Sequence, residues 1–150
     1  VPPEPAVRIR PFERADEERV LALWQDCGLT RPWNDPRKDI ARKLGEQPEL
    51  FLVGTADGRV VATAMVGFDG HRGWVYYVAV DPALQRRDIG RALMAEAERL
   101  LIERGCPKLN LQVRASNAGV IDFYRKLGYV DCGALLLPGE PLEIILRKAL

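Results

Sequence analysis

The sequence predicts a mixed α/β domain in which helices cover the faces of a mixed sheet. Three observations indicate this class. Segments that alternate in hydrophobicity are interleaved with segments of helical periodicity, an Asp57-Gly58 pair joins two apolar runs, and an apolar run at residues 74–80 leads into an amphipathic helix. The expected order is β-α-α-β-β-β-α-β-α-β-β. It forms one domain over residues 7–150, after a flexible arm at residues 1–6.

The composition is that of an ordinary globular domain. Of the 150 residues, 47% are hydrophobic and 29% are charged, and the net charge of +1 gives no general attraction to nucleic acid or to a membrane surface. No apolar run approaches the roughly 20 residues that a membrane span needs. Three widely spaced cysteines, Cys27, Cys106 and Cys132, indicate neither a disulfide framework nor a metal site. We therefore expect a cytoplasmic protein without a bound metal.

The first third of the chain is expected to hold one strand and two helices. Residues 7–10 alternate before Pro11, as a strand does. A helix begins near Asp16, with acidic residues in its first turn, and ends at Gly28. A second helix begins at an Asp-Pro pair and ends near Gly45.

The loop between these helices, at residues 29–36, carries Trp33, Asn34 and Asp35. One interpretation is structural, with Asp35 capping the second helix and Trp33 lying as a lid over the core. The other makes the loop a wall of a ligand site, because loops on a rigid scaffold commonly carry recognition.

Three strands at residues 50–56, 59–68 and 74–80 are expected to form an antiparallel meander. The Asp57-Gly58 pair is the strongest hairpin signal in the chain, and residues 69–73 make a second tight turn. That turn contains His71, the only histidine. It is either an exposed turn residue or a base, if the fold brings the turn over a substrate.

The segment at residues 74–104 carries the clearest functional signal. Its strand stops at Pro82, and a basic turn then leads into a helix with Gly90 in its first turn. The apolar face of that helix is expected to comprise Ile89, Leu93, Ala97 and Leu100. Unpaired N–H groups at a helix start bind anions, and three arginines surround this one: Arg86, Arg87 and Arg91. The pattern favours a phosphorylated ligand, although a plain turn with solvated arginines would look similar.

The last third is expected to contain a strand, a short helix and a final hairpin. The strand covers residues 109–113, Ser116-Asn117 caps the helix, and Gly128 ends it in a left-handed conformation. Strands at residues 129–137 and 142–146 then pair across Pro138-Gly139. A homodimer formed through the edge of these last strands is one arrangement that the sequence permits.

The turn Gln85-Arg86-Arg87-Asp88-Ile89-Gly90 resembles the acyl-CoA-binding motif of the GCN5-related N-acetyltransferase (GNAT) family, Gln/Arg-x-x-Gly-x-Gly/Ala. Val113-Arg114-Ala115-Ser116-Asn117 and Phe123-Tyr124-Arg125-Lys126-Leu127-Gly128-Tyr129 are similar to motifs of its ribosomal-protein N-terminal acetyltransferase branch. Residues 31–36 and 69–73 instead resemble a bacterial branch of uncharacterised acetyltransferases. The expected element order is also that of the family, so the resemblance covers nearly the whole chain.

The resemblance implies acetyl-CoA as co-substrate and direct transfer of its acetyl group to an amine of a small molecule, a protein N-terminus or a lysine. Tyr124 matches the tyrosine that donates to the coenzyme sulfur, and Asn117 matches a residue that hydrogen-bonds to the cofactor. The pantetheine arm would lie along the 74–80 strand as an added strand. The implied cofactor-binding residues are Val78, Ala79, Val80, Gln85, Arg86, Arg87, Asp88, Ile89, Gly90, Arg91, Asn117 and Tyr124.

Two positions depart from the family pattern. Asp88 replaces the first glycine of the motif, so a backbone that favours positive φ carries a carboxylate beside the pyrophosphate. We expect weaker cofactor binding, with the Asp88 side chain turned away to cap the helix. Gln112 replaces a glutamate of the ribosomal-protein branch, and an amide cannot accept a proton.

The base is therefore left open among His71, Asp35, Asp69 and a water chain that ends on Tyr76 or Tyr77. Acceptor contacts are expected from Trp33, Asn34, Asp35, His71 and Tyr76.

Two other functions fit parts of the sequence. One is a non-catalytic acyl-CoA-binding module, in which Asp88 and Gln112 mark a site that keeps its ligand and has lost turnover. The other is a nucleotide-binding domain that shares only the phosphate-binding turn. The second lacks both the Gly-Lys-Ser/Thr ending of a P-loop and the Gly-x-Gly-x-x-Gly of a dinucleotide site.

Overall fold

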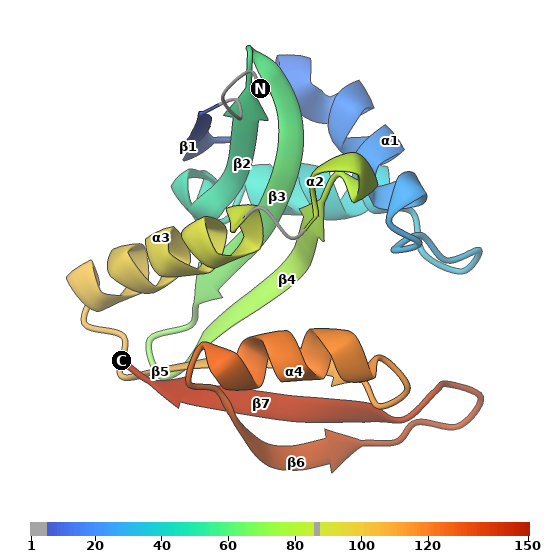
Figure 1. Ribbon diagram of the computed structural model, residues 1–150, viewed down its shortest axis with the longest axis vertical. Helices are drawn as coiled ribbons and strands as arrows, with labels where there is room; N and C mark the ends of the chain where they lie inside the picture. Colours follow the sequence, from blue (N-terminus) through green and yellow to red (C-terminus); the bar gives the residue numbers. More distant parts are fainter. Residues whose placement is uncertain (1–5, 86–87) are drawn as a thin grey trace, which may run out of the picture.

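The computed structural model describes residues 6–85 and 88–150 and contains a seven-stranded mixed sheet in the order β1-β2-β3-β4-β5-β7-β6 (Figure 1). The expected mixed α/β class and element order are confirmed. Apart from Ala6, the expected arm lies outside the described residues. The strands are β1 (Val7–Pro11), β2 (Phe51–Ala56), β3 (Arg59–Phe68), β4 (Gly73–Val80), β5 (Lys108–Arg114), β6 (Val130–Leu135) and β7 (Glu143–Ala149). The helices are α1 (Glu17–Asp26), α2 (Pro36–Leu44), α3 (Ile89–Glu103) and α4 (Ala118–Lys126).

Helices cover both faces of the sheet. Figure 1 shows α3 and α4 in front of the sheet and α1 and α2 behind it, and each pair buries its own apolar cluster. On the α3 face, Ile89, Leu93 and Ala97 are buried as expected, whereas Leu100 is only partly buried. Met94 and Leu101 complete that face, because the buried stripe of α3 is wider than the four positions taken from the sequence. No helix among the described residues is long and apolar enough to cross a membrane.

The expected helix ends are largely confirmed. Asp35 Oδ1 accepts a hydrogen bond from the N–H of Arg37 at 3.0 Å and caps α2. Asn117 Oδ1 accepts from the N–H of Val120 at 3.4 Å and caps α4. Gly128 follows α4 with φ of +97°, a conformation that glycine adopts without strain.

The last strand is longer than expected. Residues 142–146 were the expected bounds, but β7 continues to Ala149 because each residue of β5 pairs with it in antiparallel register, from Lys108↔Ala149 to Arg114↔Glu143. Antiparallel pairing stabilises positions whose own sequence pattern is weak. β6 pairs with the other side of β7 and forms the edge of the sheet.

β4 contains one residue more than β3 in the stretch where the two strands pair. Thr63 lies opposite Ala79 and Met65 lies opposite Tyr76, so a β-bulge falls between these pairs. Tyr77 sits in this bulge with φ of +53°, in the left-handed region. That conformation costs a residue with a β-carbon roughly 1–2 kcal/mol, so other contacts must hold it in place.

Those contacts come from α1 and β3. The Tyr77 ring stacks on Trp24 with ring centroids 3.8 Å apart. The Tyr77 carbonyl accepts a hydrogen bond from Thr63 Oγ1 at 2.7 Å, and Thr63 Oγ1 in turn accepts from Trp24 Nε1 at 2.9 Å. Thr63 and Trp24 are fully buried, so the hydrogen bonds of this network are shielded from water.

The parallel pairing of β4 with β5 stops before the bulge. Only Gly73↔Leu109 and Trp74↔Asn110 are paired, and Figure 1 shows the two strands diverging from that point. Beyond Trp74, β4 therefore has a partner strand on its β3 side alone among the described strands.

We predict that Thr63→Val destabilises the protein without changing the shape of the side chain. It leaves the Trp24 N–H and the Tyr77 carbonyl without their partner, and each buried group left unpaired costs about 1–3 kcal/mol. Urea unfolding should show a loss of at least about 2 kcal/mol. The matched control is Thr55→Val in β2, because the Thr55 hydroxyl makes no hydrogen bond within residues 6–85 and 88–150; equal losses in both variants would contradict the network.

Candidate functional site

The free side of β4 offers backbone groups to a ligand. The N–H of Asp81 donates to the carbonyl of Val61 in β3 at 2.7 Å, so the neighbouring Val80 carbonyl points away from β3. Gln85 Nε2 donates to this carbonyl at 3.2 Å and Cys27 Sγ at 3.3 Å. An extended ligand can pair with the rest of this edge as an added strand does.

α1 fixes the point where β4 ends. Arg19 Nη2 bonds to Asp81 Oδ2 at 2.9 Å, and Arg19 Nε donates to the Val60 carbonyl at 3.0 Å. The other oxygen of Asp81 accepts from the N–H of Ala83 at 3.0 Å and starts the turn toward α3. Both side chains of the ion pair are mostly buried, so the strand end is held firmly. The sequence alone does not indicate this role of Arg19, since its partner lies 62 residues away.

The turn before α3 adopts the backbone expected of a glycine. Asp88 has φ of +60°, and its carboxylate lies 3.7 Å from Arg91 Nε. The expected cap is wrong: the side chain accepts no hydrogen bond from the described first turn, because a capping residue needs an extended backbone that Asp88 does not have. Arg86 and Arg87 lie outside the described residues.

Gly90 is explained by packing. A β-carbon there would lie 3.2 Å from Phe123 Cζ, which is tighter than an ordinary contact. The absence of a side chain lets the start of α3 approach α4. The N–H groups of the α3 first turn have no partners within the helix, and such groups bind anions.

On the α4 side, Tyr124 is buried, with 5% of its surface exposed, and it packs edge-on against Phe123 and Tyr129. Burial raises the pKa of the Tyr124 phenol above its ordinary value, so the hydroxyl keeps its proton at neutral pH. That hydroxyl has no hydrogen-bond partner in the described part of the chain. Its proton is therefore available to a ligand.

The bulge also brings two neighbouring side chains of β4 to the same face of the sheet, the face that α1 and α2 cover. Because of the extra residue, the consecutive side chains of Tyr76 and Tyr77 both line a cavity of about 390 Å³ between α2 and the sheet, which we call the α2 cavity. Its other lining residues are Asp39, Arg42 and Lys43 of α2, Glu46 just after this helix, and Met65, Val66 and Gly67 of β3.

Asp39 is the centre of a polar network at this cavity. Its carboxylate accepts hydrogen bonds from the Tyr77 hydroxyl and, at 2.7 Å, from Asn34 Nδ2, and it forms an ion pair with Arg42. Asn34 Nδ2 also donates to the Tyr77 hydroxyl at 3.1 Å.

This network sets the charge of both groups. Burial alone would raise the pKa of Asp39, but the hydrogen bonds from Asn34, Tyr77 and Arg42 outweigh it and lower that pKa. Burial, reinforced by the adjacent Asp39, raises the pKa of Tyr77. At neutral pH the pair is thus a carboxylate and a neutral phenol.

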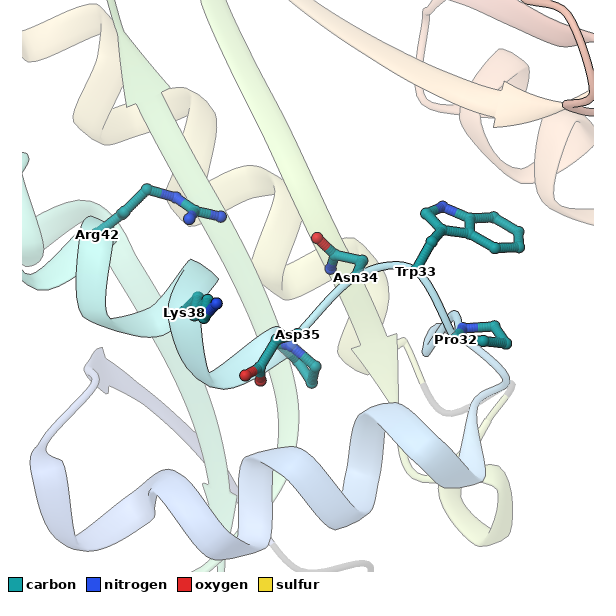
Figure 2. Close-up of a pocket in the computed structure, with 7 residues that line it drawn as sticks. Pro32, Trp33, Asn34, Asp35, Lys38 and Arg42 are labelled. Carbon is teal, nitrogen blue, oxygen red and sulfur yellow. The ribbon is translucent and has the colours of Figure 1, made fainter.

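The loop between α1 and α2 borders a second cavity of about 520 Å³, the loop cavity, which Trp33, Asn34 and Asp35 line together with Arg42. Figure 2 shows Trp33 and Arg42 at opposite ends of this cavity, with Asn34 between them. The expected tryptophan lid over the core is wrong, because 69% of the Trp33 surface is exposed. The loop turns back on itself through the Arg31↔Asn34 bridge and so points the indole outward.

The other candidate bases have structural roles or lie elsewhere. Asp69 Oδ1 accepts from the N–H groups of His71 and Arg72, both at 2.8 Å, and closes the β3–β4 turn. His71 is exposed and lines neither the α2 cavity nor the loop cavity. Asp35 is occupied as the cap of α2. Tyr76 and Asn34 are the two expected acceptor residues nearest the Asp39 network, since Tyr76 shares the α2 cavity and Asn34 bonds to Asp39.

Comparison with known proteins identifies what the chain is similar to. The model of the acetyltransferase (GNAT) family matches residues 13–129. An acetyltransferase of Sodalis glossinidius is 49% identical over 136 residues, which cover 91% of this chain and 96% of that protein. The crystal structure of Ard1 from Thermoplasma volcanium is 28% identical with a TM-score of 0.86, over 96% of this chain and 97% of that one. The ribosomal-protein-S18-alanine N-acetyltransferase of Escherichia coli is 26% identical with a TM-score of 0.78, over 96% and 94%.

We predict that the stabilising effect of Asp39 depends on pH. Its folded-state pKa lies below the value of about 3.9 in an unfolded chain, so the effect is complete above that value and is lost as the pH falls through the folded-state pKa. Asp39→Asn should therefore unfold at lower urea than the wild type at pH 7, and the difference should shrink at pH 3. A difference of equal size at both values would show that the carboxylate charge does not hold the network.

Proposed function

This chain belongs to the acetyltransferase (GNAT) family, and from that premise we propose that its two substrates meet at the bulge of β4, one from each face of the sheet. The protein is an N-acetyltransferase that uses acetyl-CoA as its co-substrate and transfers the acetyl group to an amine. The observation that supports this placement is the backbone of β4, which beyond Trp74 pairs with no described strand on its β5 side.

Acetyl-CoA would lie along this free edge. The pantetheine arm pairs with the backbone of Val78, Ala79 and Val80, and the pyrophosphate lies at the start of α3. One β4 N–H also faces the thioester oxygen as it gains negative charge. The proposed turn residues are Gln85, Arg86, Arg87, Asp88, Ile89, Gly90 and Arg91, with Gln85 acting through its bond to Val80.

Tyr124 would stabilise the departing thiolate through a hydrogen bond. A thiol has an ordinary pKa of about 8.5, and burial keeps the phenol of Tyr124 well above that value, so the hydroxyl donates a hydrogen bond to the sulfur. Asn117 uses its carbonyl oxygen to cap α4, which leaves its amide N–H groups for the cofactor.

The acceptor amine would enter through the α2 cavity, beside Tyr77. The ionised Asp39 attracts a cationic amine to this place, and the neutral Tyr77 hydroxyl lies between that carboxylate and the bulge. Asn34 and Tyr76 contribute to the same surface, and Trp33 and Asp35 border it on the loop side.

The acceptor in this proposal is an amine that loses its proton easily. Asp39 is a weak base because its pKa is lowered, and Gln112 cannot accept a proton. An α-amine, with a pKa of about 7.7–8.0, is partly neutral at pH 7, whereas a lysine side chain near 10.4 is not. The E. coli relative is named as a ribosomal-protein-S18-alanine N-acetyltransferase, and acetylation of an alanine nitrogen is consistent with an α-amine.

The non-catalytic module and the nucleotide-binding domain are both set aside. The relatives that span nearly the whole chain are named acetyltransferases, and the family model covers the turn that suggested a nucleotide.

We predict that Tyr124→Phe lowers kcat by roughly 10²-fold, the usual cost of removing a hydrogen-bond donor that stabilises developing negative charge, while the KM for acetyl-CoA changes little. Release of free thiol in the presence of acceptor amines measures both values. The control is Tyr129→Phe, a buried neighbour whose hydroxyl only reaches Glu98 at 3.4 Å. If the two variants lose kcat equally, Tyr124 has no role in the chemistry.

We predict that Asp88→Gly tightens acetyl-CoA binding by about two- to fivefold, because it removes an exposed negative charge, worth roughly 0.5–1 kcal/mol, beside the pyrophosphate. Calorimetric titration measures the Kd. The control is Asp57→Gly in the β2–β3 hairpin, which also replaces an aspartate of left-handed backbone conformation by glycine and should leave the Kd unchanged. An unchanged Kd in Asp88→Gly would place the pyrophosphate away from this turn.

A further inference from the structure

The side of α2 that lines the α2 cavity carries charges of both signs. Asp39, Arg42 and Lys43 occupy positions i, i+3 and i+4 and so project to the same side of the helix, and Glu46 follows just after the helix end. Across the cavity lie the aromatic rings of β4 and the apolar surface of Met65. The cavity thus joins an apolar wall to a row of charged groups.

Two of these charges already have partners. The Asp39 carboxylate is bonded to Tyr77 and Asn34, and Arg42, whose side chain is exposed, forms an ion pair with it. Lys43 differs, because it forms no ion pair within the described ranges 6–85 and 88–150 although its side chain is half-buried. Burial lowers the pKa of Lys43, and the more distant Glu49 and Glu46 only partly oppose this effect.

No side chain of the sheet covers this ammonium group at Gly67. A β-carbon there would lie 3.7 Å from Lys43 Nζ and 3.8 Å from Gln47 Oε1, both in ordinary van der Waals contact. The gap between Nζ and β3 is therefore about the size of a methyl group, and an anion would approach Nζ from the α2 cavity, which Lys43 lines. A half-buried ammonium without a carboxylate partner is stabilised when an anion binds it.

We propose that Lys43 binds a carboxylate of the acetyl acceptor, so that the enzyme prefers amines that also carry this group. The inference rests on the proposed acceptor site in the α2 cavity. Asp39 and Lys43 are one helical turn apart, about 6 Å on the surface of the helix. An amine held at the Asp39–Tyr77 end therefore reaches Lys43 when about three carbons separate its nitrogen from the carboxylate.

The test compares three acceptors that each carry an α-amine, with thiol release as the readout: the α-amide of glutamate, whose nitrogen and carboxylate are separated by three carbons, the neutral α-amide of glutamine, and the α-amide of phosphoserine. We expect the wild type to show a kcat/KM at least tenfold higher for the glutamate compound than for the glutamine compound. Lys43→Met should abolish this preference and Lys43→Arg should retain it, with the KM for acetyl-CoA unchanged in both. Lys38→Met, which removes the same charge from an exposed position of α2, should keep the preference.

Several results would overturn the proposal. Equal kcat/KM for the glutamate and glutamine compounds, or an equal preference in the wild type and Lys43→Met, would show that Lys43 does not select the acceptor, while the acetyltransferase function would stand. A higher kcat/KM for the phosphoserine compound would replace the carboxylate with a phosphate.

A binding measurement separates failure of this inference from failure of the acceptor site. If none of the three amines is acetylated, glutarate is titrated into protein saturated with CoA, and the amide resonance of Gly67 is followed by NMR. A shift in the wild type that is absent in Lys43→Met supports the carboxylate site without turnover. No shift in either protein contradicts it.

Discussion

The extra residue at Tyr77 in β4 is the constraint on which the rest of the structure depends. It follows the point where the pairing of β4 with β5 ends, at Trp74, and it turns two consecutive tyrosines toward α2. This part of β4 therefore combines an edge without a described partner strand and a lined cavity on one face of the sheet. The cost of the extra residue is a left-handed tyrosine, which is offset by the stacking on Trp24 and by the hydrogen bonds through Thr63.

α1 connects the two halves of the site. Its Trp24 supports the bulge, and its Arg19 fixes Asp81 at the end of the same strand, so both ends of the cofactor-binding edge are held from one helix. The acceptor side uses the neighbouring helix, because Asp39 of α2 bonds to the hydroxyl of Tyr77. A change in the position of either helix would therefore alter the geometry at β4, where the chemistry is proposed to occur.

Sequence periodicity predicted the element order, the Asp57-Gly58 hairpin and the caps at Asp35 and Asn117, because these features depend on neighbouring residues. It predicted neither the bulge nor the Asp39–Tyr77 bond, whose partners lie 38 residues apart and meet only in the folded sheet. The position of Trp33 as a lid over the core and the role of Asp88 as a helix cap were wrong for the same reason. The backbone conformation of the folded chain decides where each of these side chains points. The positions of the proposed cofactor residues follow from the fold, but their roles stay predictions.

The proposed function depends most on the free edge of β4, and amide hydrogen exchange tests most directly whether the cofactor binds there. Within residues 75–80, the N–H groups that face β5 should exchange rapidly in the free protein and become protected when CoA is added. Those that pair with β3 should be protected in both states. Exchange that CoA leaves unchanged along the whole strand would contradict the account, because the cofactor would then bind somewhere other than beside the bulge.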